Sequence, residues 1–211
     1  SQVGLKNLAS EESPVNAANT VEDHIFRAML RTRLILDVEN CKYSRCGRTD
    51  AGVSATGQVI ALKLRSSSSK AVNAAAETIN YAKILNGQLP DDIRILDWAK
   101  VDDDFSARFS CSARLYHYYF CKQHYDSATR SVVELDVELM SQAAAKIVGV
   151  HDFRNFCRKD PSKPNQSYTR QVFEAFIEPV NSQSSFYRFV CKGSAFLYHQ
   201  VRCLMSALFM I

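Results

Sequence analysis

The sequence lacks the marks of a secreted or membrane-spanning protein. Its seven cysteines are an odd number, it contains no CxxC pair, and no signal peptide is visible. This cysteine usage is typical of reduced, mostly buried thiols in an intracellular protein. The apolar stretch 203–211 is far shorter than the roughly 20 residues that a membrane-spanning helix needs. We therefore expect a soluble protein with no membrane partner.

Motifs for nucleotide and metal binding are also missing. Residues 47–52 read GRTDAG, and their glycine spacing resembles that of a P-loop. Val53 stands where a P-loop needs its lysine, and a helix and loop precede the motif where a P-loop requires a strand. His117, Cys121 and His124 have approximate metal-ligand spacing, but strand alternation places His124 on the opposite face from the other two. The sequence therefore predicts no P-loop, no metal site and no small-molecule cofactor.

What the sequence does contain is an ordinary globular composition in which charges of opposite sign are kept apart. Of its 211 residues, 46% are hydrophobic and 23% are charged, which suits one large domain or two small lobes. The net charge is +4, with acidic residues gathered at 91–92, 102–104 and 134–138 and basic residues gathered elsewhere. Such a surface suits a polyanion such as RNA, although a solvated basic face is the commoner reason for it.

Hydrophobic periodicity predicts an α+β protein with antiparallel sheet and helices on one side of it. Helices are predicted at residues 20–36, 71–86, 136–148 and 196–211, and strands at 58–65, 93–101, 112–122, 169–180 and 185–192. The order of helix, strand, helix and further strands occurs twice, with a boundary near 102–110. We therefore predict two similar lobes, an N-terminal lobe at 1–104 and a C-terminal lobe at 105–211.

The segment 43–66 contains the residues that raise the functional question. Arg48 and Asp50 lie two residues apart, between Gly47 and Gly52. Taken alone, this pattern is typical of a tight Asp-x-Gly turn with a surface ion pair. Its neighbours along the chain favour a second interpretation.

Four segments, in the same order, resemble the TruA-type pseudouridine synthases. They read GRTDAGVSATGQV at 47–59, FSARFSCSARLYHYYF at 105–120, GVHDFRNFC at 149–157 and KGSAFLYHQVRCLM at 192–205. Three motifs are most similar to those of the eukaryotic tRNA pseudouridine-38/39 synthase branch: RCGRTD, NFCRKD and FLYHQVRCLM. The family's first strand has no counterpart here and the chain stops within the helix of the fourth segment, so we expect a fold truncated at both ends.

This resemblance implies a tRNA pseudouridine synthase that isomerises uridine in the anticodon arm, at positions 38 and 39. The reaction breaks the N1–C1′ bond, turns the base and rejoins it through C5, without cofactor, metal or energy source. A carboxylate is needed near the sugar and base, either to bond covalently or to deprotonate the ribose. The resemblance also implies a catalytic cleft between the lobes, tRNA as a partner, a homodimer as one assembly to consider, and a nuclear and/or cytoplasmic location. The alternative is a non-catalytic tRNA-binding fragment of the same fold.

Four residues match functional positions of the family. Asp50 matches its catalytic aspartate, and Arg48 matches the arginine that holds the flipped nucleotide. Tyr116 matches the tyrosine that stacks on the flipped base; it could also be an ordinary packed aromatic, although Arg114 on the same face favours function. Arg202 lies on an otherwise apolar helix, where an unpaired charge is costly, and the resemblance gives it the catalytic carboxylate as a partner.

Basic clusters supply candidates for phosphate contacts with tRNA, which we expect to be recognised by its shape rather than by an extended base code. Each of these residues could also be plain solvated surface. The candidates are Lys42, Arg45, Lys63, Arg65, Arg154 and Arg158.

Overall fold

The chain forms two compact units, Ser1–Ser110 and Cys111–Ile211, in a computed structural model that describes residues 20–66, 79–126, 130–159, 161, 164–181 and 185–211. Both units contain helices and antiparallel strands, which confirms the predicted α+β class. No helix in the described ranges is long and apolar enough to cross a membrane.

Unit 1 begins with helix α1, Val21–Arg31, whose start follows from its sequence. Thr20 is the N-cap, and its side-chain oxygen accepts a hydrogen bond from the backbone N–H of Asp23 at 3.2 Å. The sequence predicts a helix to residue 36, but α1 ends at Arg31, because Arg33 takes a left-handed φ of 55° that helical backbone does not allow. The buried side of the helix consists of Ile25, Ala28 and Met29, whereas Val21, which shares their apolar periodicity in the sequence, is exposed.

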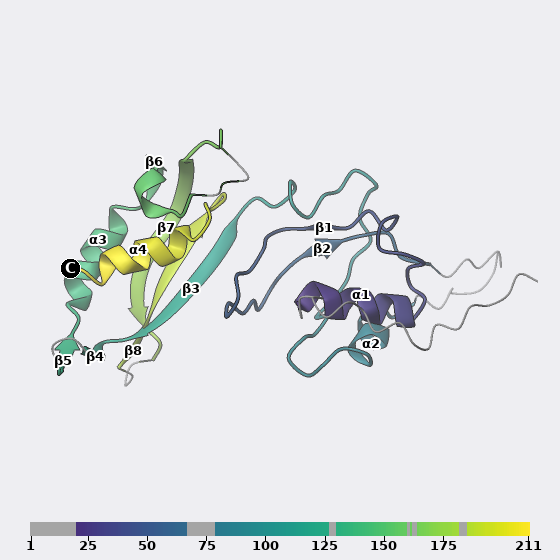
Figure 1. Ribbon diagram of the computed structural model, residues 1–211, viewed down its shortest axis with the longest axis horizontal. Coiled ribbons are helices and arrows are strands. Elements are labelled where there is room, and N and C mark those ends of the chain that lie inside the picture. The colour runs from purple at the N-terminus through teal and green to yellow at the C-terminus, as the bar shows by residue number, and fades with distance from the viewer. Residues whose placement is uncertain (1–19, 67–78, 127–129, 160, 162–163, 182–184) are drawn as a thin grey trace, which may run out of the picture. The chain divides into compact units, whose positions relative to one another are not determined.

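The strand predicted at 58–65 is formed only at β2, Ile60–Ala61. It pairs antiparallel with β1, Ser44–Arg45, a strand that the sequence does not predict because two residues are too few to show periodicity. Figure 1 shows the two segments that carry these strands running beside one another. Alternate residues of the predicted strand still pack against the core, as in a half-buried strand: Ile60, Leu62 and Leu64.

The second helix of unit 1, α2, spans Tyr81–Asn86. Asn80 caps its start by accepting a hydrogen bond from the backbone N–H of Lys83 at 2.9 Å. The helix ends at residue 86, as predicted, with Gly87 as its C-cap. Residues 71–78 of the predicted helix lie outside the described residues. Both helices pack on one core, whose buried members are Ile25, Ala28, Met29, Leu34, Ile35, Cys41, Leu85, Leu89 and Ile93.

The strand predicted at 93–101 is wrong, because no strand forms there. The side-chain amide of Asn86 donates to the carbonyl of Ile95 at 2.9 Å and accepts from its N–H at 2.8 Å. The Arg94 guanidinium donates to the carbonyl of Ile93 at 2.7 Å. Side chains therefore satisfy backbone groups that would otherwise need a neighbouring strand.

Unit 2 is built on a four-stranded antiparallel sheet in the order β3-β8-β7-β6, with a separate hairpin of β4 and β5 (Figure 1). The long strands β3, β7 and β8 are those the sequence predicts. The elements are β3 Arg114–Cys121, β4 Gln123–Asp126, β5 Ser131–Glu134, α3 Val137–Ala145, β6 Gly149–Asp152, the 3-10 turn η1 Arg154–Phe156, β7 Thr169–Pro179, β8 Phe186–Gly193 and α4 Gln200–Leu208.

The core of unit 2 lies between the two helices and one face of this sheet. Phe120 of β3 and Phe189 of β8 are buried on that face, together with Met140 of α3 and Met205 of α4. On the other face of β3, Leu115, His117 and Tyr119 are exposed, as strand alternation requires. Helices therefore cover one side of the sheet, as predicted for an α+β fold.

Three features of unit 2 differ from the sequence prediction. The strands β4, β5 and β6 are not predicted, because each is only four residues long. Helix α3 ends at Ala145 rather than at 148, with Lys146 as its C-cap. Helix α4 begins at Gln200 rather than at 196, because its N-cap His199 has a left-handed φ of 59°.

Candidate active site

The candidate catalytic residue Asp50 lies on a tight turn in unit 1. Its backbone carbonyl accepts a hydrogen bond from the N–H of Val53 at 3.1 Å, and Gly52 has a φ of 77°. A Cβ at Gly52 would meet no atom within 4 Å, so the turn needs glycine for its backbone angle and not for space. The Asp50 side chain is half-buried, while Arg48 is exposed. The predicted tight turn is therefore confirmed.

The two ends of this loop are tied together at its base. The backbone N–H of Cys46 donates to the carbonyl of Val59 at 2.9 Å. The Cys46 thiol donates to the side-chain oxygen of Gln58 at 2.6 Å, and the Gln58 amide donates to the carbonyl of Gly47 at 3.2 Å. Gln58 thus bridges both strands of the loop immediately before Arg48.

A charged network joins the start of α1 to the segment that leads into the loop. The Tyr43 hydroxyl donates to Glu22 Oε1 at 2.5 Å, and the Arg45 guanidinium forms an ion pair with the same oxygen. Partial burial acts to raise the pKa of Glu22, but hydrogen bonds from Arg45 and Tyr43, with the charges of Arg45 and Arg48, hold it below its usual value. Burial and the Glu22 carboxylate raise the pKa of Tyr43.

Tyr116 lies in β3, half-buried, on the face that the helices cover. Its ring meets the ring of Phe196 edge-on, with centroids 5.0 Å apart and an interplanar angle of 79°. The nearby Arg114 guanidinium donates to the carbonyl of Ser194 at 2.7 Å. A Cβ at Gly193 would lie 2.8 Å from the Gln171 carbonyl oxygen and 3.1 Å from the Phe196 ring, so only glycine fits there.

Arg202 lies in the first turn of α4 and is exposed. Because the side chain is exposed, the sequence argument from the cost of burying its charge does not apply. Arg48 and Asp50 belong to unit 1, whereas Tyr116 and Arg202 belong to unit 2. The approach of Arg202 to Asp50 stays a prediction.

The six candidates for phosphate contacts fall into two groups. Three form ion pairs: Arg45 with Glu22, Lys63 with Asp103 at 3.4 Å, and Arg154 with Asp152 at 2.6 Å. The last two pairs are well exposed, and such pairs are weak enough to open for a phosphate. The other three are exposed and make no ion pair within the described part of the chain: Lys42, Arg65 and Arg158.

Sequence reasoning missed Glu22, Tyr43 and Phe196. The signal for Glu22 was present but ambiguous, because acidic residues in the first turn of a helix are favoured by the helix dipole alone. Phe196 lies within the segment resembling the family, but its contact with Tyr116 joins residues 80 positions apart.

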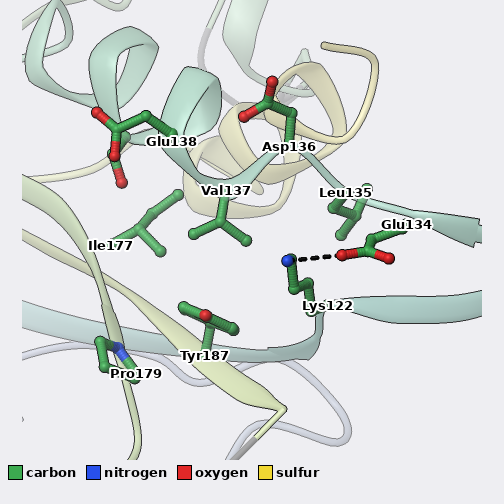
Figure 2. A pocket seen from close by; sticks show the side chains of 10 residues that line it. Lys122, Glu134, Leu135, Asp136, Val137, Glu138, Ile177, Pro179 and Tyr187 are labelled. Atoms are coloured by element: carbon green, nitrogen blue, oxygen red, sulfur yellow. Dashed lines mark ion pairs between the residues drawn. The ribbon is translucent and has the colours of Figure 1, made fainter. Parts of the chain in front are cut away.

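A cavity in unit 2 is lined by none of these residues. It has a volume of about 620 Å³, and its lining combines apolar side chains with Lys122, Ser141, Tyr187 and an acidic rim of Glu134, Asp136 and Glu138. Figure 2 shows Lys122 reaching Glu134 across its edge, in an ion pair of 2.6 Å. An acidic rim repels phosphate, so this cavity does not suit an RNA backbone. Within the described ranges, no group of three or more His, Cys, Asp or Glu side chains is arranged to hold a metal ion.

Comparison with known proteins finds a family model that matches part of this chain and relatives that match nearly all of it. The family model described as tRNA pseudouridine synthase matches residues 143–211. The human protein named tRNA pseudouridine(38/39) synthase is 43% identical over 99% of this chain, and the Saccharomyces cerevisiae protein of that name is 41% identical over 91%. The chain spans 45% of the human protein and 42% of the yeast protein, which is less than half of either.

A bacterial relative is covered over most of its length. The Moorella thermoacetica protein named tRNA pseudouridine synthase A is 34% identical, and the match covers 90% of this chain and 72% of that protein. The Lysinibacillus sphaericus protein of the same name is also 34% identical, with 67% of it covered. At this identity and coverage, the chain belongs to the TruA-type family of tRNA pseudouridine synthases.

Proposed function

We propose that the protein containing this chain isomerises uridine to pseudouridine at positions 38 and 39 in the anticodon arm of tRNA. One observation carries this proposal: relatives named tRNA pseudouridine(38/39) synthase are 41–43% identical over 99% of the chain. The turn that holds a half-buried Asp50 beside an exposed Arg48 supports a site that can receive a polyanion.

Asp50 supplies the carboxylate of the reaction. The N1–C1′ bond breaks, the uracil turns, and a C5–C1′ bond forms, while C5 loses a proton and N1 gains one. Atoms and electrons balance without an oxidant, reductant or second substrate. Asp50 acts either by bonding covalently to the substrate or by deprotonating the ribose. Its turn lets the backbone approach the RNA, since Gly52 has no side chain and open space beside it.

Two of the remaining residues hold the flipped nucleotide, and the third holds the catalytic carboxylate. A uridine inside a stem-loop has to leave its stack to reach a carboxylate, and an aromatic face receives it. Tyr116 offers such a face, and its edge-on contact with Phe196 fixes the ring plane. Arg48 holds the nucleotide, and Arg202 pairs with the catalytic carboxylate in the assembled site.

Binding of tRNA comes chiefly from phosphate contacts. Lys42, Arg65 and Arg158 are exposed, so their charges are available to phosphates. Lys63 and Arg154 can exchange their weak surface ion pairs for phosphates. These contacts follow the shape of the tRNA rather than reading its bases.

We also propose a homodimer and a nuclear and/or cytoplasmic location, on the strength of the family resemblance. Light scattering of the purified whole protein tests the assembly, and imaging of a tagged protein tests the location. A monomeric mass or exclusion from both compartments would overturn the respective proposal.

The function is tested by incubating the whole protein with total tRNA and mapping pseudouridine at single-nucleotide resolution. New pseudouridine at positions 38 and 39 is expected, with uridines elsewhere largely spared. Modification confined to other positions would reassign the substrate site. Binding of tRNA without any new pseudouridine would favour a non-catalytic tRNA-binding protein.

A further inference from the structure

Glu22 connects helix α1 to the segment that carries the candidate catalytic loop. It accepts a hydrogen bond from the Tyr43 hydroxyl at 2.5 Å and an ion pair from the Arg45 guanidinium, both on the same carboxylate oxygen. These partners lie 21 and 23 residues away in the sequence. They come shortly before Arg48 and Asp50, so Glu22 holds the chain where it enters the loop.

Arg48, within the loop, also interacts electrostatically with Glu22. Arg48 contributes to the electrostatic stabilisation of the Glu22 carboxylate, alongside the closer Arg45. Of these two cations, Arg45 is the one in direct contact with Glu22.

This network is better shielded than the other ion pairs of the basic candidates. The side chains of Arg45 and Glu22 are 26% and 34% exposed, against 51% and 90% for Lys63 and Asp103. A partly buried, hydrogen-bonded pair is screened less by solvent and keeps a fixed geometry. Arg45 is therefore poorly suited to leave Glu22 for a phosphate.

The loop beyond these anchors has little packing of its own. All side chains at 51–59 are exposed, and the ladder between β1 and β2 contains only two residue pairs. Gln58 ties the two sides of the loop at Cys46 and Gly47. The orientation of Arg48 and Asp50 therefore depends on the contacts that hold the residues just before the loop.

We propose that Glu22 is a positioning residue, which holds Tyr43 and Arg45 so that the loop presents Arg48 and Asp50 to the substrate. In this role Arg45 anchors the loop and does not bind a phosphate. The proposal rests on the proposed function, because it assumes that Asp50 is the catalytic carboxylate.

The test compares Glu22→Gln with Asp23→Asn in the whole protein. Both variants replace a carboxylate by an amide in the first turn of α1, and both remove an ion pair, since Asp23 pairs with Arg27 at 2.6 Å. Only Glu22 contacts the segment before the loop, so Asp23→Asn controls for the helix dipole and for a lost surface charge.

For Glu22→Gln we expect kcat for pseudouridine formation to fall roughly tenfold to a hundredfold, as for a misplaced catalytic group. Affinity for tRNA should stay equal or rise, because an acid has been removed from a basic segment. Amide hydrogen exchange across 44–53 should become faster, whereas Asp23→Asn should leave kcat and this exchange at wild-type values.

Three results would overturn the proposal: a wild-type kcat in Glu22→Gln, an equal loss of kcat in Asp23→Asn, or a loss of kcat with unchanged exchange across 44–53. If Glu22→Gln does not fold, Tyr43→Phe takes its place, because it removes one hydrogen bond and leaves the charges. It should lower kcat severalfold and quicken the same exchange, and wild-type behaviour in both would refute the anchor. A wild-type protein without activity would defeat the proposed function, while the exchange measurements would still decide whether Glu22 orders the loop.

Discussion

The side-chain amide of Asn86 hydrogen-bonds both backbone polar groups of Ile95, at 2.9 and 2.8 Å. One side chain at the end of α2 thereby does what a neighbouring strand would do for the segment that follows. Removing it leaves a part-buried N–H and a part-buried carbonyl without these partners.

We therefore expect Asn86→Ala to lower the free energy of unfolding by about 1–3 kcal/mol, the usual effect of leaving such groups unpaired. Urea denaturation of the whole protein measures it. Asn155→Ala, at an exposed position in unit 2, is the control and should change stability by no more than about 0.5 kcal/mol. Equal effects of the two substitutions would show that the Asn86 bonds contribute nothing.

The second prediction separates chemistry from binding. Asp50→Asn should reduce pseudouridine formation by at least about a hundredfold, because an amide can neither act as a base nor bond covalently to the substrate. Affinity for tRNA should be nearly unchanged, since no phosphate contact is lost. Asp92→Asn, which removes another exposed carboxylate of unit 1, should keep full activity. Near-normal isomerisation by Asp50→Asn would exclude Asp50 as the catalytic residue.

The third prediction concerns the ion pair between Arg202 and Asp50. If they form one in the whole protein, their charged atoms lie at about 4 Å or somewhat further apart without RNA. Arg202→Gln should then lower kcat, and adding it to Asp50→Asn should cause little further loss, because both act on one group. Lys146→Gln is the control for a lost cation in unit 2. Fully additive losses, or an experimental structure with the two residues far apart, would rule out the pair.

The fourth prediction concerns acid and alkali. The pKa of Glu22 is lowered because its hydrogen bonds and neighbouring cations outweigh the effect of partial burial, so Glu22 stabilises the fold above its unfolded pKa of about 4.5. That contribution is lost as the pH falls through the folded pKa. Glu22→Gln should therefore flatten the fall in stability below this pH, measured by urea denaturation at a series of pH values.

Tyr43 acts at the other end of the pH range. Burial and the Glu22 carboxylate raise its pKa, so its contribution is complete below its ordinary value of about 10.0 and is lost as the pH rises beyond it. Tyr43→Phe should remove this alkaline loss. A slope above that pH identical to the wild type would contradict the assignment.

The fifth prediction uses salt to count phosphate contacts. Arg65→Gln should weaken tRNA binding and reduce the slope of log affinity against log salt by about 0.7–0.9, the value for one phosphate contact. Arg45→Gln should leave the slope unchanged, because Glu22 already holds that guanidinium. A reduced slope in Arg45→Gln alone would reverse the roles of the two residues.

Long elements with their own periodicity could be predicted from the sequence, and short ones could not. The strands β3, β7 and β8 carry eight to eleven residues each, enough for alternation to be visible. The start of α1 is encoded by Thr20, whose side chain does not need the rest of the fold to cap a helix. The strands β1 and β2 have two residues each, and they form only through their pairing with one another.

At the candidate site, the turn at Asp50 was predictable because Gly52 marks it locally. The partners of Glu22 were not, because Tyr43 and Arg45 are ordinary residues until folding brings them to one carboxylate. The contact between Tyr116 and Phe196 likewise depends on the pairing of β3 with β8. The residues that could carry the chemistry could be identified from the sequence, but the long-range contacts that hold them in place could not.

The two glycines near the candidate residues differ in how easily evolution could replace them. Gly193 has no room for any side chain, so even a copy that had lost catalysis would have to keep it in order to fold. Gly52 stands in open space and is needed only for the shape of its turn. Once selection on the reaction is relaxed, Gly52 can be replaced at the cost of local strain in its turn and without disturbing the core, while Gly193 cannot. Among relatives, the glycine of the turn is therefore the better indicator of retained activity.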